Sequence, residues 1–134
     1  MGWDYIYLEK EKIIQVVIKG EYKARNIDDC RKGLQAKARE LSTKKVIVDY
    51  RQTDYHVDIF NISKTPDYLL KNEMVKDYYY AVILNPDNET HKRLKLCFSN
   101  IDVKNFLYGY NIRYKKFESV EESIAWLNKE NIKD

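Results

Sequence analysis

Val46-Ile47-Val48 is an unbroken apolar run that ends in Asp49-Tyr50-Arg51, and it decides the fold of this chain. A strand without alternation of apolar and polar side chains is typical of a parallel sheet, where strands are buried on both faces. A second run of this kind, Tyr79 to Leu84, ends in Asn85-Pro86-Asp87. The two runs predict neighbouring parallel strands in one sheet.

The amino-terminal residues predict an antiparallel hairpin at the edge of that sheet. Residues 4–9 alternate, with Tyr5 and Tyr7 on one side and Ile6 and Leu8 on the other. A charged turn separates them from a β-rich run, Ile13 to Ile18. Two such runs joined by a short polar link favour a hairpin.

Helical periodicity follows the hairpin and recurs between the later strands. The first pattern covers residues 27–42, with Asn26 as the expected N-cap, and the last follows a capping box formed by Ser119 and Glu122. Two further helices are predicted between the first and the last, each marked by a proline after a capping side chain, at Thr65-Pro66 and Asn85-Pro86. The apolar positions of the four patterns are Ile27, Cys30, Leu34, Ala38 and Leu41; Tyr68, Leu69 and Leu70; Leu94, Cys97, Phe98 and Ile101; and Ile124, Trp126 and Leu127.

These elements predict an α/β fold with the order ββαβαβαβα, in which residues 111–117 form the last strand. Strands that alternate with helices favour a mostly parallel sheet, here of five strands with the antiparallel hairpin at its amino-terminal end. The chain has 134 residues, 44% of them hydrophobic, with only four Gly and two Pro. This is the size and composition of a single folded domain that covers residues 1–134.

Composition also narrows the class of protein. The net charge is +3 and no basic tail or arm exists, so nucleic acid is not the expected partner. The longest apolar run, Tyr78 to Leu84, is far shorter than the roughly 20 residues that span a bilayer, and no signal peptide is visible. Cys30 and Cys97 lie far apart within apolar stripes, which favours buried thiols. A cytoplasmic location is the resulting expectation.

The order of elements and several local patterns resemble those of STAS-like domains related to anti-sigma-factor antagonists. The hairpin, the first helix and the strand followed by Asp49-Tyr50-Arg51 match the family's pattern of a strand followed by Asp-x-Arg. Further similarities are the region of Ile59-Phe60 and Pro66, the strand Ala81-Val82-Ile83, Gly109, Phe117, and residues 121–127. The resemblance covers nearly the whole chain and implies a small regulatory or scaffold module that is not an enzyme.

The resemblance also bears on phosphorylation and on ligand binding. Anti-sigma-factor antagonists carry a phosphorylatable serine in an Asp-Ser-Ser-Gly-like stretch after a central strand, whereas Asp49 is followed here by Tyr50-Arg51-Gln52-Thr53-Asp54. Thr53 is the nearest hydroxyl and the candidate phosphoacceptor, without the matching context. The STAS-like group is also similar in fold to lipid-transfer domains, which implies an apolar ligand as an alternative.

Polar side chains gather where the two predicted parallel strands end. Asp49, Arg51 and Asp54 follow one strand, and Asn85 and Asp87 follow the other. Ligands of open α/β sheets bind at the carboxyl ends of the strands, so these residues predict a ligand or partner site in which Arg51 pairs with an anion. The alternative is that Arg51 and an aspartate pair with each other and shape the loop.

No pattern in the chain indicates a catalytic, cofactor or metal site. His56 and His91 have no companion at metal-ligand spacing, and the glycines are too scattered for a phosphate loop. The twelve tyrosines suit sheet packing or a protein interface. The leading hypothesis is therefore a module that acts through protein contacts, as a homodimer or with another protein. The alternatives are a small carrier of an apolar or amphipathic ligand and an enzyme with a convergent site.

Overall fold

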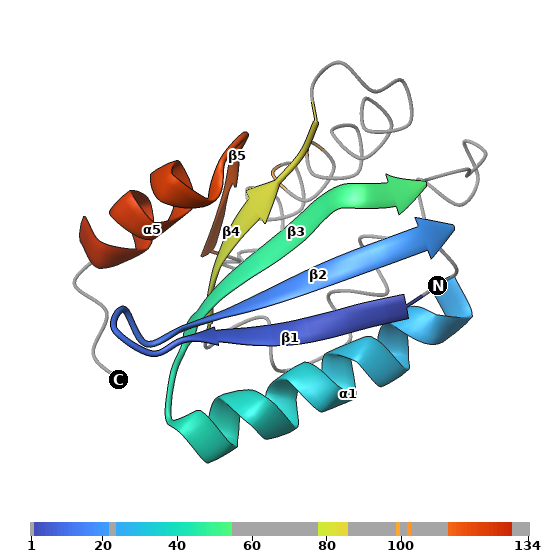
Figure 1. The fold of residues 1–134 in the computed structure, drawn as a ribbon, viewed down its shortest axis with the longest axis horizontal. Helices are drawn as coiled ribbons and strands as arrows, with labels where there is room; N and C mark the ends of the chain where they lie inside the picture. The colour runs from blue at the N-terminus through green and yellow to red at the C-terminus, as the bar shows by residue number, and fades with distance from the viewer. Residues whose placement is uncertain are drawn as a thin grey trace.

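Five strands form one mixed sheet in the order β1-β2-β3-β4-β5 (Figure 1). The computed structural model describes residues 2–21, 24–54, 78–85, 99, 102 and 113–129, apart from the side chains of residues 24, 25, 27 and 28. β1 is antiparallel to β2, and every later pair of neighbours is parallel. The strands are β1 (Gly2–Leu8), β2 (Ile13–Glu21), β3 (Lys45–Asp54), β4 (Tyr79–Ile83) and β5 (Arg113–Phe117).

The predicted hairpin and the predicted parallel pair are both confirmed. Leu8 pairs with Ile13 across the turn of the hairpin, and Val46 pairs with Tyr80 in the parallel register of β3 and β4. The two predicted helices between β3 and β5 lie outside the described residues, except for the helical residues Ser99 and Asp102. Outside them also lie the predicted positions His56, Ile59, Phe60, Pro66, Asp87, His91, Cys97 and Gly109.

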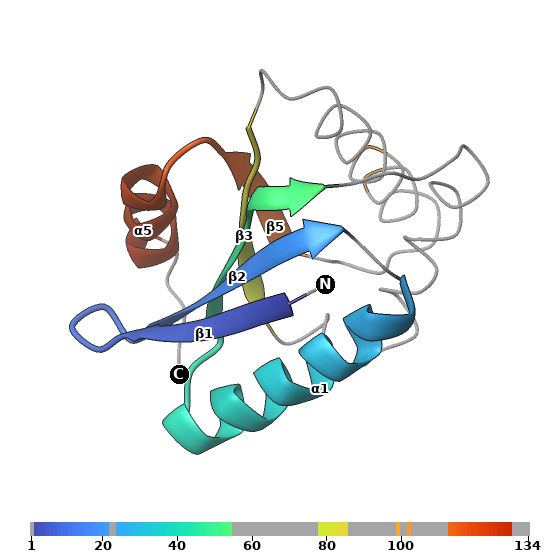
Figure 2. The same cartoon turned by 45° about the vertical axis from the view of Figure 1, so that its right-hand side comes forward.

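Two helices cover opposite faces of the sheet (Figure 2). α1 (Ala24–Leu41) packs through Cys30, Leu34 and Ala38 on the face formed by alternate residues of β2 and β3. α5 (Val120–Lys129) packs through Leu127 on the other face. Because β3 lies between the two layers, Val46 and Ile47 are both fully buried although they point in opposite directions. This explains why the run that decides the fold shows no alternation.

The start of α1 and the end of β3 are among the boundaries that differ from the sequence-based predictions. Asn26 is not the N-cap of α1, because the helix begins at Ala24 and Asn26 lies inside its first turn. Alanine and arginine, the residue types at positions 24 and 25, both favour helix, so α1 begins before the expected N-cap. β3 does not end near Asp49 but continues to Asp54, since Tyr50 and Thr53 are buried further along the strand. The charged residues placed on a loop by the prediction therefore belong to a strand.

The exit of α1 is tied to the turn of the hairpin. Ser42 has a φ of 52°, and the bonds Ser42 N–H to Arg39 O (3.3 Å) and Thr43 N–H to Ala38 O (3.1 Å) close a Schellman motif. The hydroxyl of Thr43 then donates to the carbonyl oxygen of Lys12 at 2.5 Å. This bond fixes the start of β3 beside the start of β2.

Candidate functional site

A buried carboxylate lies at the centre of the candidate site. Asp49 is 2% exposed and pairs in register with Val17 of β2 and Ile83 of β4. Nε of Arg51 donates to its Oδ1 at 3.0 Å, and Nη2 donates to its Oδ2 at 2.7 Å. The backbone N–H of Arg51 adds a bond of 3.0 Å to Oδ1, and Nε2 of Gln15 adds one of 3.1 Å to Oδ2. The carboxylate therefore accepts four hydrogen bonds, two of them from one guanidinium in a bidentate pair.

These contacts keep the pair charged. Burial alone raises the pKa of Asp49, but the hydrogen bonds and positive charge of Arg51, together with the bond from Gln15, outweigh burial and lower that pKa. The hydrogen bond with Asp49 raises the pKa of Arg51 against the effect of its burial, and the charges of Asp49 and Glu121 add to the increase. Asp49 is a carboxylate at neutral pH, held in the sheet by its own neighbour.

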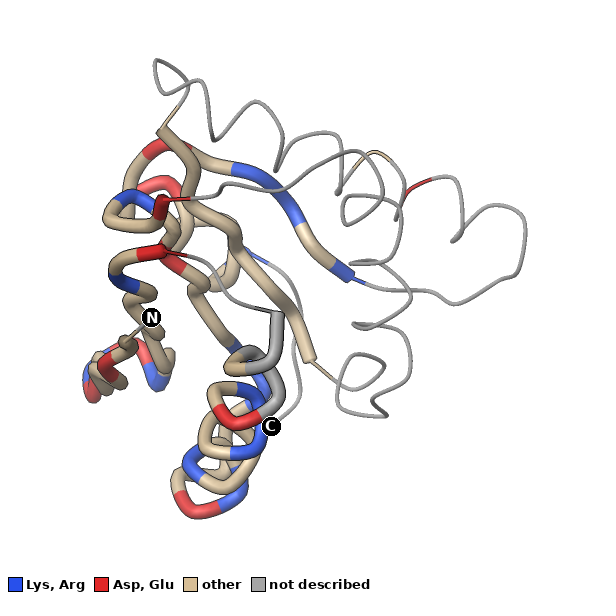
Figure 3. Tube along the Cα trace, turned by 90° about the vertical axis from the view of Figure 1, so that its right-hand side faces the viewer, with Lys and Arg blue, Asp and Glu red and all other residues tan. Residues whose placement is uncertain are grey.

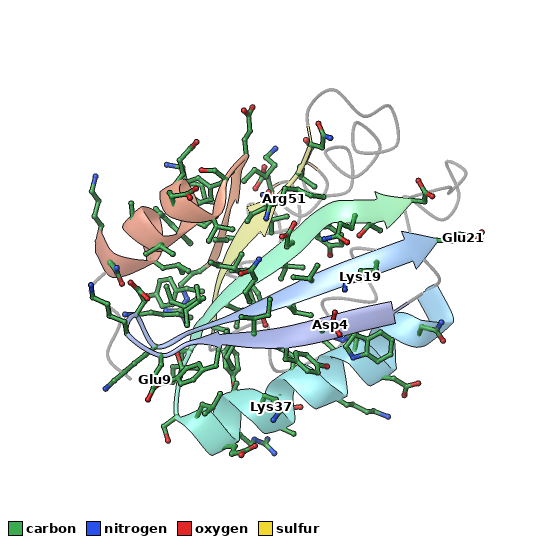
Figure 4. All side chains as sticks on the ribbon, in the orientation of Figure 1. Asp4, Glu9, Lys19, Glu21, Lys37 and Arg51 are labelled. Atoms are coloured by element: carbon green, nitrogen blue, oxygen red, sulfur yellow. The ribbon has the colours of Figure 1, made fainter. Side chains whose placement is uncertain are left out.

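A β-bulge in β3 positions the arginine. Val17 pairs with Asp49 and Lys19 pairs with Gln52, so β3 advances by three residues between these two pairs while β2 advances by two. Without the extra residue, the register would place Arg51 directly opposite Lys19, and like charges at such positions destabilise a sheet. The bulge puts the uncharged Gln52 there instead. Arg51 is left to fold back over Asp49, with 43% of its side chain exposed (Figure 4).

The amino-terminal turn of α5 brings an acidic side chain toward this pair. The predicted capping pair is confirmed: Oγ of Ser119 accepts from the N–H of Glu122 at 3.2 Å and donates to Oε1 of Glu122 at 3.3 Å. The glutamate contacts the hydroxyl of Ser119, whereas the usual capping box has it accept from the backbone N–H. The cap fixes the first turn of α5, so that the charge of Glu121 acts on Arg51.

The remaining predicted residues take different positions around the pair. Asn85 is exposed and lies two residues after Ile83, as Arg51 lies two residues after Asp49, so the parallel register brings both to the carboxyl edge of the sheet. Asp54 is exposed and pairs with Glu21 at the far end of β3, and within the described part of the chain it forms no hydrogen bond with Asp49 or Arg51.

Thr53 is shielded in this arrangement. Its residue is 2% exposed, and its hydroxyl donates to the carbonyl oxygen of Ile18 at 2.7 Å. A kinase would reach that hydroxyl only after the end of β3 had separated from β2. The candidate phosphoacceptor thus has a structural role in the strand pair as it lies here.

Sequence reasoning missed two members of the site. Gln15 is the single polar residue in the apolar run Ile13 to Ile18, and this interruption was the signal for a buried polar partner. Glu121 stands inside the capping box, where an acidic residue is explained by the helix dipole alone. Only the packing of α5 against the sheet shows its second role.

Two further observations bear on the class of protein. Within residues 2–21, 24–54, 78–85, 99, 102 and 113–129, no three His, Cys, Asp or Glu side chains gather in a group that could hold a metal ion. Among the helices that the structure describes, none is long and apolar enough to cross a membrane.

Comparison with known proteins reveals similarity at the level of fold. No protein-family model and no curated protein matches the chain. The chain is similar to the NMR structure of the protein TM1081, with a TM-score of 0.61 and 13% sequence identity over 97% of this chain and 91% of that one. At this identity the likeness supports the α/β fold alone.

Proposed function

We propose that the chain is a STAS-like regulatory module that acts through protein contacts, with Arg51 at the centre of its recognition surface. One observation carries this proposal: the side chain of Arg51 is 43% exposed, yet two hydrogen bonds to a buried carboxylate hold its guanidinium in one orientation. An arginine that is already ordered loses little side-chain entropy when a partner binds, and arginine is enriched among the residues that dominate binding energy.

The composition of the surroundings supports a recognition surface more than a reaction centre. The carboxylate of Asp49 and the hydroxyl of Thr53 are both engaged in hydrogen bonds inside the sheet. Two exposed polar residues accompany the guanidinium: Asn85 follows β4 at the position that the register sets beside Arg51, and the charge of Glu121 on α5 acts on Arg51. A partner that presents a carboxylate to Arg51 and a donor to Glu121 fits this pattern of charge.

The order of the described elements supports the STAS-like part of the proposal. The hairpin, α1, the parallel strands β3, β4 and β5, and α5 follow one another as the predicted order requires, with the two intervening helices outside the described residues. STAS-like modules are the non-enzymatic family that the sequence resembles.

Affinity capture with matched variants tests the proposal. Arg51→Ala removes the guanidinium, Arg51→Lys keeps the charge without the bidentate pair, and Lys37→Ala removes an exposed cation from α1 as a control (Figure 4). We expect the wild-type protein and Lys37→Ala to retain the same protein from an extract of the source cell. Arg51→Ala should lose it, and the purified partner should bind wild-type protein at least about tenfold more tightly than Arg51→Ala, or about 1.4 kcal/mol.

Two outcomes would contradict the proposal. Equal binding of the purified partner to wild type and to a folded Arg51→Ala variant would remove Arg51 from the surface. Native mass spectrometry that finds an added small mass, lost on denaturation, would favour the carrier of an apolar or amphipathic ligand instead.

A further inference from the structure

The two edges of the sheet differ in charge. β5 is one edge strand of the described sheet. Three of its five residues are Lys or Arg, which Figure 3 colours blue. Lys115 and Lys116 are exposed. Lysine on an edge strand opposes pairing with another chain because the approach would bury a charge or bring like charges together. Arg113 is anchored beside them, with its Nη1 donating to the hydroxyl of Tyr79 at 2.9 Å. Two copies of this edge repel each other.

β1, the opposite edge, lacks this protection. Its only charged residue is Asp4, and the ammonium of Lys19 lies 2.6 Å from that carboxylate (Figure 4). Ile6 is 44% exposed and is the one large hydrophobic side chain exposed in the part of the chain that the structure describes. β1 is seven residues long and has β2 as its one strand neighbour in the described sheet, so alternate N–H and C=O groups along it point away from the sheet.

We propose that β1 is a self-association edge, on which the β1 strands of two copies pair antiparallel about a twofold axis. The two five-stranded sheets then form one continuous sheet. Side chains directly opposite each other in an antiparallel pair share one face, so the twofold axis of a symmetric pair lies at one residue of β1. The registers that pair at least five of its seven residues are those centred on Asp4, Tyr5 or Ile6. The register centred on Ile6 places Ile6 against Ile6 of the second copy and Tyr5 against Tyr7.

Charge and apolar surface select this register and this occupant. A centre at Asp4 would oppose two carboxylates, and a centre at Tyr5 would oppose each Asp4 to the apolar Ile6 of the second copy. A centre at Ile6 leaves each Asp4 with its own Lys19 and brings the two exposed isoleucines together. Because the paired Asp4 and Lys19 leave the edge without net charge, neither a strongly acidic nor a strongly basic strand gains from it, while an identical strand meets no repulsion. An isologous contact also closes on itself at two copies, which avoids the open-ended growth of a β1-to-β5 contact.

Sedimentation of purified protein over a range of concentrations tests the pairing. We expect the mass to rise with concentration from the 16.1 kDa of one chain to twice that value. Ile6→Lys gives β1 the protection that β5 already has, and it should raise the dimer dissociation constant by about tenfold or more. Ala125→Lys adds the same charge at an exposed position of α5 and should leave the dissociation constant unchanged.

Cysteine cross-linking tests the register. Ile6→Cys places two thiols at directly opposed positions, within the distance that a disulfide needs, and it should form a covalent dimer under mild oxidation. Asp4→Cys is opposed to Leu8 in this register and should cross-link far more slowly, as should the wild-type chain with its own cysteines. Circular dichroism confirms that each variant is folded.

Several results would overturn this inference. A wild-type chain that stays monomeric at every concentration removes the contact, and an Ile6→Lys protein that dimerises as strongly as wild type places it elsewhere. Cross-linking of Asp4→Cys as fast as Ile6→Cys removes the register. None of these results touches the Arg51 proposal, since β2 separates β1 from β3 and each surface has its own variants.

Discussion

Asp49 keeps its charge in the interior because four donors surround its carboxylate, three of them from Arg51 and one from Gln15. Its folded-state pKa is therefore below the unfolded value of 3.8. The lowered pKa makes the free energy of unfolding depend on pH. This contribution to stability is fully present above the unfolded pKa and is lost as the pH falls through the lower folded pKa.

Asp49→Asn should lower the free energy of unfolding near neutral pH by about 2 kcal/mol, because an amide nitrogen then faces donors that need an acceptor. The partial exposure of Arg51 keeps the loss below that of a fully buried ion pair. Urea unfolding over a range of pH provides the measurement. The gap between the variant and wild type should narrow below pH 3.8, and a gap independent of pH would show that the carboxylate charge does not matter.

Residue-level prediction from the sequence singled out Asp49 and Arg51, which the structure pairs, and missed Gln15. Asp49 and Arg51 were identifiable because charges that end an apolar strand are conspicuous. Whether Arg51 faces a ligand or its own neighbour depended on the bulge in β3, and one extra residue leaves no trace in hydrophobic periodicity. The structure shows the second alternative, a pair between Arg51 and Asp49, and part of the arginine side chain is exposed.

Within elements, Gly33 shows how one helix position depends on a neighbouring strand. It lies inside α1, where glycine costs about 1 kcal/mol relative to alanine. A Cβ at this position would overlap the hydroxyl of Tyr5, which donates to the carbonyl oxygen of Cys30 at 2.6 Å. Burial raises the pKa of that hydroxyl to about 12, so it stays a donor at neutral pH.

Gly33→Ala should therefore destabilise the wild-type protein by about 1 kcal/mol or more, although alanine is the better helix former. In a Tyr5→Phe background the overlapping oxygen is gone, and the same substitution should cost less. Urea unfolding of the four proteins completes a double-mutant cycle. Additive effects would mean that the helix and the strand do not meet at this point.

The carboxyl end of α1 predicts a stabilising change. Ser42 occupies the left-handed conformation that glycine adopts without strain, with a φ of 52°. Ser42→Gly should raise the free energy of unfolding by about 0.5–1 kcal/mol, measured by thermal or urea unfolding. Ser42→Ala, which offers no such relief, is the matched control. A glycine variant no more stable than the alanine variant would contradict the assigned motif.

For the whole molecule, the sequence predicted the layers better than the boundaries. The unbroken run at Val46 indicated a strand covered on both faces, and the structure places α1 on one face and α5 on the other. Boundaries such as the start of α1 and the end of β3 depend on which side chains find cover in three dimensions. Thr53 resembles a loop residue in the sequence, but it belongs to β3, where its hydroxyl donates to the carbonyl oxygen of Ile18.

The bond between Thr43 and Lys12 bears on the order in which the chain folds. The hairpin and α1 draw on contacts close in sequence, whereas the pairing of β2 with β3 must first close a loop through the whole helix. The hydroxyl of Thr43 fastens the far end of that loop to the turn of the hairpin, and β3 can then pair with β2 residue by residue from Val46 onward.

Thr43→Val removes this bond and the bond that the hydroxyl oxygen accepts from the N–H of Lys45 at 3.3 Å. On this account it should slow refolding more than it speeds unfolding, because the contact with Lys12 acts in the folding nucleus. Stopped-flow measurement of both rates in urea decides the matter, and an effect confined to the unfolding rate would show that the bond forms late. The hydroxyl of Thr43, at the end of a helix, would then limit how fast the parallel strands pair, in addition to stabilising the folded sheet.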